Sequence, residues 1–388
     1  MRTIKTTEEA YSVLKAPKEN VWYYGSETAL KEVLNDRRPT IISAVSEREA
    51  LIRDCISADI LIDPTDEIKE CIKLCDRLVI YGASTLSADK FDRIIEAVIS
   101  VKNDIKIICV GDLLTRITCA VNGYSSPVES AYWEKLDFVK VGFLYNQVDS
   151  EYRNALNKIR NGDFSGAEWL NANCCTTSKN WDVRICTTQS QAEEINFAAH
   201  RRRVNNTAPE RMIDSRIKGT IEGDISPAEL PVPMEIRYEC GDPFMFAADE
   251  TKIPRMYVNP IYGRVYIFGA NEDVGGYIKI DGINYGFKRF TWHKRTLKVL
   301  TDEFGEKSIG YKSVAAYSHF PTLQADALSL SQTEGLNFPR IIIDPKTTMK
   351  GELAALLSRG RSASGVVLLN PIEPEDLKFD ETIIEVFK

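Results

Sequence analysis

The sequence predicts an α/β protein with two parallel-sheet domains and a small β-barrel inserted into the second. Short apolar strands alternate with amphipathic helices over residues 1–125, which is typical of a parallel sheet with helices on both faces. The same alternation begins again at Trp181 and returns after Val314, whereas residues 236–310 hold short strands separated by glycines. A chain of 388 residues suits two to three domains.

The first domain, residues 1–125, is expected to contain four strands and several helices. The strands fall at 21–24, 40–44, 78–80 and 105–110, and helices follow at 25–34, 47–56 and 87–101. Ser87 suits the N-cap of the third helix, and Asp89 suits its first turn, where an acid complements the helix dipole. Residues 1–15 also show an amphipathic helix pattern.

Residues 126–180 are expected to form a helical bridge, with helices at 151–161 and 165–171. The second α/β domain then comprises residues 181–235 and 311–388. Its expected strands are 183–186, 340–344 and 365–369, and its helices are 190–203 and 349–358. Residues 236–310 form the inserted barrel.

Composition excludes several classes of protein. The formal net charge of -7 provides no overall basic field for nucleic acid, so any such binding must depend on local charge. No long apolar run predicts a membrane span. Nine cysteines without zinc-finger spacing, beside three histidines, indicate reduced, buried thiols of a cytoplasmic protein and no metal site.

Two C-terminal segments carry a family resemblance. Residues 327–338 read ALSLSQTEGLNF and residues 355–362 read ALLSRGRS. They resemble the motifs Ser-Ile-His-Lys-Ser-Gln-Gly-x-Thr and Val-Ala-Leu-Ser-Arg-x-Arg-Ser of superfamily-one helicases of the Dda/RecD-like, Pif-type branch. Residues 181–196 resemble the segment that opens the second domain of these enzymes. The matches run in family order along nearly the whole chain. The resemblance implies two RecA-like domains with an SH3-like β insert in the second, and a phage-encoded protein.

Departures from the family motifs gather at the ATP site. Residues 25–31 lack the Gly-Lys-Ser/Thr that cradles phosphates, and Tyr81 and Gly82 stand where the family has the Asp-Glu that holds Mg²⁺. Thr115 replaces a coupling glutamine and Asn146 a phosphate-contacting arginine. The degenerate ATP-site positions are therefore Gly25, Lys31, Tyr81, Gly82, Thr115, Asn146 and Arg359, of which Arg359 keeps the family residue. Because phosphoryl transfer needs all these parts together, we expect no catalysis and no cofactor.

A local basic and aromatic window indicates nucleic-acid binding. Residues 251–300 hold nine Lys/Arg, three Asp/Glu and nine aromatic residues, with the densest stretch at 287–295. Cations that meet phosphates, interleaved with rings that stack on bases, suit an unpaired strand. The candidates are Lys288, Arg289, Phe290, Trp292, Lys294, Arg295 and Arg264, and the resemblance adds Ser43, Thr188, Ser331 and Gln332. The alternative is that the rings fill the barrel core and the charges are solvated.

A second basic cluster, residues 200–203, ends the helix expected at 190–203. A structural role is favoured for it, since cations complement the C-terminal end of a helix dipole.

The sequence thus predicts a catalytically inactive, helicase-like protein that binds single-stranded DNA. It would serve replication or transcription as an accessory or recruitment factor, for example by bringing a polymerase to exposed single strands in the host cytoplasm. Two alternatives remain open: a protein-interaction scaffold without DNA binding, and a divergent, active ATP-dependent DNA helicase.

Overall fold

The computed structural model describes most of the residues of the chain. They are 2–4, 21–24, 39–112, 126–141, 149–178, 182–203, 211–214, 216–219, 230–238, 242–247, 262–267, 276–280, 283–333 and 336–387. Four of the predicted ATP-site positions, Gly25, Lys31, Thr115 and Asn146, lie outside them.

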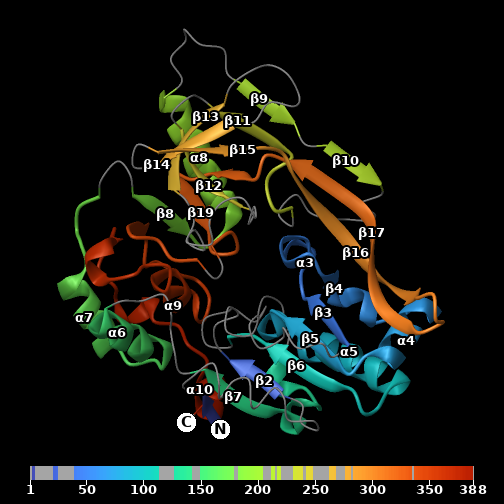
Figure 1. Cartoon of the computed structure of the whole chain (residues 1–388). Coiled ribbons are helices and arrows are strands. Elements are labelled where there is room, and N and C mark those ends of the chain that lie inside the picture. Colours follow the sequence, from blue (N-terminus) through green and yellow to red (C-terminus); the bar gives the residue numbers. More distant parts are fainter. Residues whose placement is uncertain are drawn as a thin grey trace.

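Seven parallel strands make up most of the first sheet (Figure 1). Their order is β1 (Arg2–Ile4), β7 (Asp137–Val141), β2 (Val21–Tyr24), β6 (Lys106–Val110), β5 (Arg77–Tyr81), β3 (Thr40–Ala44) and β4 (Ile56–Ser57). The expected strands are therefore confirmed. Two expectations are wrong: residues 2–4 form a strand and not a helix, and the segment expected as a helical bridge contributes β7 to this sheet.

Helices α3 (Glu47–Arg53), α4 (Asp66–Leu74) and α5 (Ala88–Val101) accompany this sheet. Ser87 caps α5 as predicted, since its side chain accepts a hydrogen bond from the backbone N–H of Lys90. Helix α3 is shorter than expected, because Asp54 takes a left-handed φ of 54° and Ile56 enters β4.

The second sheet is also parallel, in the order β19 (Ala327–Ser329), β8 (Val183–Cys186), β20 (Ile341–Ile343) and β21 (Val366–Leu368). Helices α8 (Gln189–Arg203) and α9 (Glu352–Leu357) belong to it, and α6 (Ser150–Arg160) and α7 (Ser165–Asn173) pack beside it. The buried Tyr152 hydroxyl of α6 donates to the carbonyl of Leu357 in α9. The C-terminal helix α10 (Glu381–Phe387) returns to the first core through Ile383.

Antiparallel strands form the described parts of the region expected to hold the barrel, and neighbouring strands from outside that region pair with them. A five-stranded sheet has the order β15 (Ile283–Phe287), β14 (Gly276–Ile280), β13 (Tyr262–Ile267), β12 (Pro243–Phe246) and β18 (Thr322–Gln324), and β9 (Arg211–Asp214) pairs with β11 (Glu235–Tyr238). A long hairpin follows, of β16 (Phe290–Thr301) and β17 (Lys307–His319), with β10 (Arg216–Gly219) on its outer edge. The boundary expected at residue 310 falls inside β17.

The β16–β17 hairpin connects the two halves of the molecule (Figure 1). Strand β16 pairs with β4 in parallel at Arg295 and Ile56, so the first sheet extends to ten strands. Trp292 and Tyr317 lie in the core of the second half, whereas Leu297 lies in the core of the first. The register of the hairpin shifts between Lys294 and Arg295, at the point where it passes from one core to the other.

Within the described residues, no helix has both the length and the apolar character that a membrane crossing requires.

Candidate nucleotide and nucleic-acid sites

The carboxyl end of β5 carries a buried aromatic ring. Tyr81 is only 3% exposed, and the guanidinium carbon of Arg53 lies 4.4 Å from the centroid of its ring. Gly82 follows with a φ of 73°, a left-handed conformation that glycine adopts without strain. Tyr81 and Gly82 therefore place a phenol beside a cation at this strand end, and neither of the two residues carries a carboxylate.

The neighbouring strand β6 ends in Gly111 and Asp112. A Cβ atom at Gly111 would lie 2.8 Å from both the backbone nitrogen and the hydroxyl of Ser84, so only glycine fits there. The carboxylate of Asp112 accepts two hydrogen bonds from Nη2 of Arg160, at 2.9 and 3.1 Å. Because Arg160 belongs to α6, this ion pair joins the first sheet to the helices of the second half.

Arg359 follows α9 and is half-buried. Its Nη1 donates to the hydroxyl of Ser358 at 3.4 Å, and its carbonyl accepts from the backbone N–H of Phe338 at 2.8 Å. Of the seven predicted ATP-site residues, the structure thus describes Tyr81, Gly82 and Arg359.

Two thiols of the first half, those of Cys55 and Cys75, are buried and protonated. Burial raises the pKa of Cys55 to about 12 and that of Cys75 to about 11. Within the described ranges, no three His, Cys, Asp or Glu side chains gather closely enough to bind a metal ion.

Trp292 is a core residue. It is 2% exposed, lies 5.0 Å from the ring of Phe290 in an edge-on arrangement, and lies 5.8 Å from the ring of Tyr317. A ring enclosed in this way cannot stack on a base, so the structure does not support the predicted role of Trp292. Phe290 packs partly buried against the same core.

Two of the predicted DNA-binding cations are engaged within the protein. Lys294 lies 3.5 Å from Glu47, and Arg295 forms two contacts with Asp54, both on or beside α3. Arg289 is half-buried, with its guanidinium 5.3 Å from the ring of Phe320. Lys288 is exposed, as expected for a phosphate-binding side chain.

Arg264 lies in β13, opposite Lys279 of β14. Ser43 differs from expectation, since it is fully buried and its hydroxyl donates to the carbonyl of Val79 at 2.9 Å, between β3 and β5. It therefore holds the sheet together and does not line a surface.

Thr188 and Ser331 lie at one edge of the second sheet. In the parallel pairing of β19 with β8, Ser329 is opposite Cys186, and Ser331 and Thr188 each follow two residues later. Both are exposed. The loop after β19 is held by Gln332, whose Oε1 accepts from the backbone of Ser329 at 2.9 Å. The structure thus gathers three of the predicted residues, Thr188, Ser331 and Gln332, at this edge.

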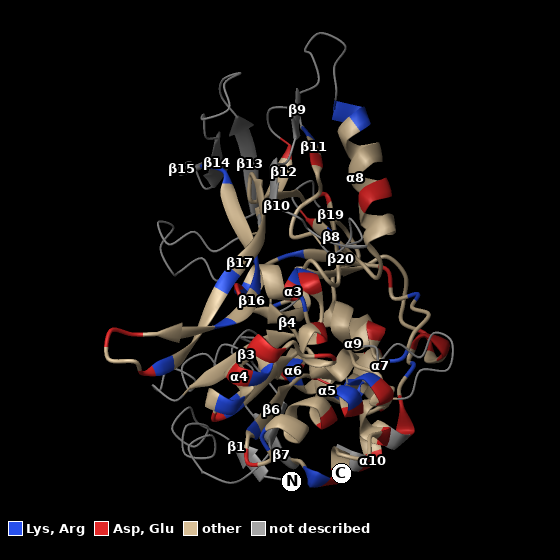
Figure 2. Ribbon diagram, turned by 90° about the vertical axis from the view of Figure 1, so that its right-hand side faces the viewer, with Lys and Arg blue, Asp and Glu red and all other residues tan. Residues whose placement is uncertain are grey.

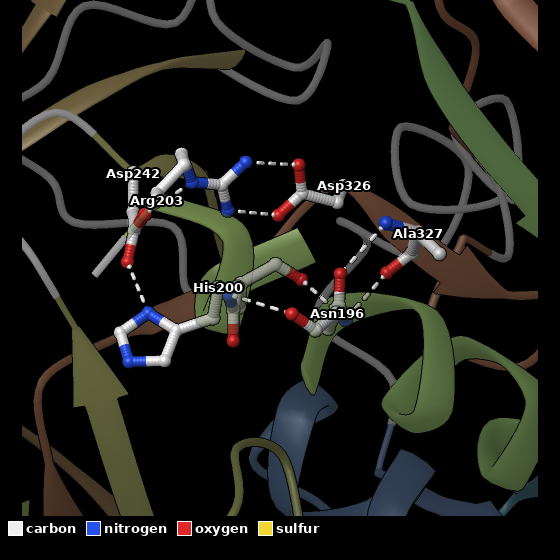
Figure 3. A network of polar contacts seen from close by, with 7 residues as sticks. Asn196, His200, Arg203, Asp242, Asp326 and Ala327 are labelled. Carbon is white, nitrogen blue, oxygen red and sulfur yellow. Dashed lines mark hydrogen bonds and ion pairs between the residues drawn. The ribbon is translucent and has the colours of Figure 1, made fainter. Parts of the chain in front are cut away.

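The basic run at the end of α8 is partly structural, as predicted, through a buried network that the sequence did not reveal (Figure 3). Nδ1 of His200 lies 3.0 Å from Asp242, and Arg203 contacts Asp242 and Asp326, each at 2.7 Å. These contacts hold the pKa of Arg203 well above its usual value, chiefly through the hydrogen bonds to Asp326. One turn earlier, Asn196 exchanges two hydrogen bonds of 2.8 Å with the backbone of Ala327.

Comparison with known proteins gives matches by structure alone. No protein-family model and no curated sequence matches this chain. A double-mutant Pif1 helicase from Bacteroides superposes with a TM-score of 0.81 at 20% identity, covering 99% of this chain and 96% of that one. Bacteroides Pif1 bound to ssDNA gives 0.61 at 20% identity, with 98% and 95% covered. Pif1 helicase from Candida albicans gives 0.71 at 15% identity, with 98% of each chain covered. Over nearly its whole length, the chain has the fold of the Pif1 helicases.

Proposed function

We propose that this protein is a helicase-like factor that binds single-stranded DNA and does not hydrolyse ATP. The observation that carries the proposal is the carboxyl end of β5, where Tyr81 is buried against the guanidinium of Arg53. A divalent cation bound with ATP requires oxygen ligands, and a guanidinium at that end of the sheet repels it.

Asp112 adds a second argument. It is the acidic residue at the end of β6, and its carboxylate is engaged by Arg160 in a two-contact ion pair. Using Asp112 as a metal ligand would leave a largely buried arginine without this partner, which carries a desolvation cost of a few kcal/mol. Without a metal and a positioned water, phosphoryl transfer does not proceed at a useful rate.

Binding of single-stranded DNA is supported by the fold and by the exposed edge of the second sheet. Two of the similar structures, both of Bacteroides Pif1, are complexes with ssDNA. In this chain, Thr188, Ser331 and Gln332 at the sheet edge present hydroxyl and amide groups. Such groups donate to phosphate oxygens without reading sequence. Exposed Lys288 beside the hairpin supplies a cation.

Phosphate release tests the first half of this proposal. The purified protein is incubated with ATP and Mg²⁺, with and without a single-stranded oligonucleotide. We expect no release above the background of a mock purification. Release that single-stranded DNA stimulates would instead identify an active helicase with divergent motifs.

Fluorescence anisotropy tests the second half. Labelled single- and double-stranded oligonucleotides are titrated at low and high salt. We expect the single strand to bind more tightly, and its affinity to fall as salt rises, because bound phosphates displace counterions. Equal binding of both forms, or none, would favour a protein-interaction scaffold.

A role as a recruitment factor for a replication or transcription polymerase follows from binding without turnover. Such a protein marks an exposed strand and does not move along it.

A further inference from the structure

The last turn of α8 has two faces with different roles. His200 and Arg203 point inward, where Asp242 and Asp326 engage them (Figure 3). Arg201 and Arg202, in the same run, are exposed. Figure 2 shows this basic end of α8 at the periphery of the molecule. The buried network thus accounts for His200 and Arg203. Arg201 and Arg202 do not belong to it.

Phe197 adjoins these outward arginines. It is 54% exposed, and the guanidinium carbon of Arg201, one helical turn later, lies 5.6 Å from the centroid of its ring. The Arg201 guanidinium lies over the Phe197 ring, so a half-exposed aromatic side chain is held beside a positive charge.

We propose that Phe197, Arg201 and Arg202 form a contact site for an unpaired nucleic-acid strand, with one base stacked on Phe197 and adjacent phosphates bound by the two arginines. The inference rests on the proposed function and adds a location to it. Stacking on an exposed ring accepts any base, and paired cations select phosphates over neutral ligands.

The charges around the site limit where a strand can lie. Glu193 and Glu194 are exposed one turn before Phe197, and they repel phosphates. The strand must therefore cross the last turn and cannot follow the helix back toward Thr188. Thr188 and Arg202 are separated by a helix length of about 20 Å, so this contact is distinct from the edge of the second sheet.

Phe304 provides a matched control. It is 84% exposed at the tip of the β16–β17 hairpin, but its neighbours Asp302, Glu303 and Glu306 are acidic (Figure 2). If exposed aromatic area alone caused binding, both phenylalanines would contribute. If stacking needs nearby cations, only Phe197 will.

The experiment measures binding of a labelled oligothymidylate by anisotropy across a range of salt. Phe197→Ala should weaken binding about five- to tenfold, the lower part of the range for one lost base stack. Replacing Arg201 and Arg202 by Ala should reduce the slope of log affinity against log salt by about 1.4, since each phosphate contact on a single strand contributes about 0.7. Phe304→Ala and the double variant Lys69→Ala/Lys73→Ala, which removes two partly exposed lysines of α4, should stay within about twofold of the unchanged protein.

Phe197→Trp gives a direct readout of stacking, because the indole emission should be quenched when the oligonucleotide binds. Thermal unfolding of every variant should match the parent, as these side chains are exposed. The inference is overturned if the parent binds the oligonucleotide and the Phe197 and arginine variants bind it equally well, or if they weaken single-strand and duplex binding alike. If the parent itself does not bind, the proposed function fails as well.

Discussion

Arg295 and Asp54, 241 residues apart in sequence, form a two-contact ion pair across the two halves of the molecule. Nη2 of Arg295 lies 2.7 Å from Oδ2 of Asp54, and Nε contacts Oδ1. Asp54 ends α3, and Arg295 occupies the position at which β16 joins β4. The pair thus fixes the hairpin at the point where its register shifts.

Removing this pair should destabilise the protein modestly. Because Asp54 is half-exposed, we expect Arg295→Ala to lower the free energy of unfolding by about 0.5–1 kcal/mol. A double-mutant cycle with Asp54→Asn, measured by urea unfolding, should give a coupling energy of similar size. Lys312→Ala, an exposed change on β17, serves as the control. Fully additive effects of the two changes would show that the ion pair contributes nothing.

Trp292 should contribute to the stability of the fold and not to the affinity for DNA. Trp292→Ala removes a buried ring from the second core and should cost about 3–5 kcal/mol in urea unfolding. The milder Trp292→Phe keeps most of the packing, so its oligonucleotide affinity in anisotropy should remain within about twofold. A large loss of oligonucleotide affinity in a stably folded Trp292→Phe variant would show that the indole ring of Trp292 does contribute to DNA binding.

Placing carboxylates at positions 81 and 82 should not produce ATP hydrolysis. Gly82→Glu places a side chain at a φ of 73° and should cost about 1–2 kcal/mol of stability from backbone strain. Adding Tyr81→Asp buries a carboxylate at the end of β5. We expect no ATP-dependent phosphate release from the double variant, provided that circular dichroism shows it folded. Clear turnover would indicate that the remainder of the ATP site is intact.

The buried polar network at the end of α8 should contribute strongly to the folding stability of the second half of the molecule. Asp242 is 1% exposed and contacts both His200 and Arg203. Asp242→Ala leaves these groups without that carboxylate and should cost about 3–5 kcal/mol, seen as a lower midpoint of urea unfolding. Glu193→Ala, on the exposed face of the same helix, should change the midpoint little.

Alkaline pH should destabilise the fold through its buried thiols. Burial raises the pKa of Cys55 from 9.0 to about 12 and that of Cys75 to about 11. Above pH 9 the unfolded chain releases these protons while the native state retains them. The contribution of these thiols to the free energy of unfolding is therefore fully present below pH 9. It falls as pH rises toward 11, by up to about 1.4 kcal/mol per pH unit for each thiol. Urea unfolding at pH 8 and pH 10 measures the fall, and Cys55→Ala should reduce it. An identical fall in that variant would exclude a contribution from Cys55.

The two parallel sheets could be predicted from the sequence because their strands are apolar on both faces. Arg77–Tyr81 and Lys106–Val110 are buried throughout, so each reads as a short hydrophobic run between turns. Strand β7, Asp137–Val141, is not predicted because its residues, DFVKV, mix polar and apolar types without regular alternation, within a segment that otherwise suggests helices.

The candidate DNA site was harder to predict, because composition does not tell which face of a strand is buried. Phe290 and Trp292 are two residues apart and share a face, and that face packs on the core. Lys294 and Arg295 meet acids more than 240 residues earlier in the chain, contacts that no local pattern reveals. Thr188 and Ser331, which the family resemblance supplied, lie close together because the parallel register of β8 and β19 brings the positions after the two strands side by side.

The β16–β17 hairpin places Trp292 in one core and Leu297 in the other, so it connects the two halves of the molecule directly. Any hinge motion between the halves must bend it at the irregularity between Lys294 and Arg295, or else withdraw Leu297 into water. Withdrawing Leu297 costs about 2–3 kcal/mol. Bending at the irregularity strains the Arg295–Asp54 ion pair, which contributes about 0.5–1 kcal/mol, so we expect such a motion to bend the hairpin at these two residues.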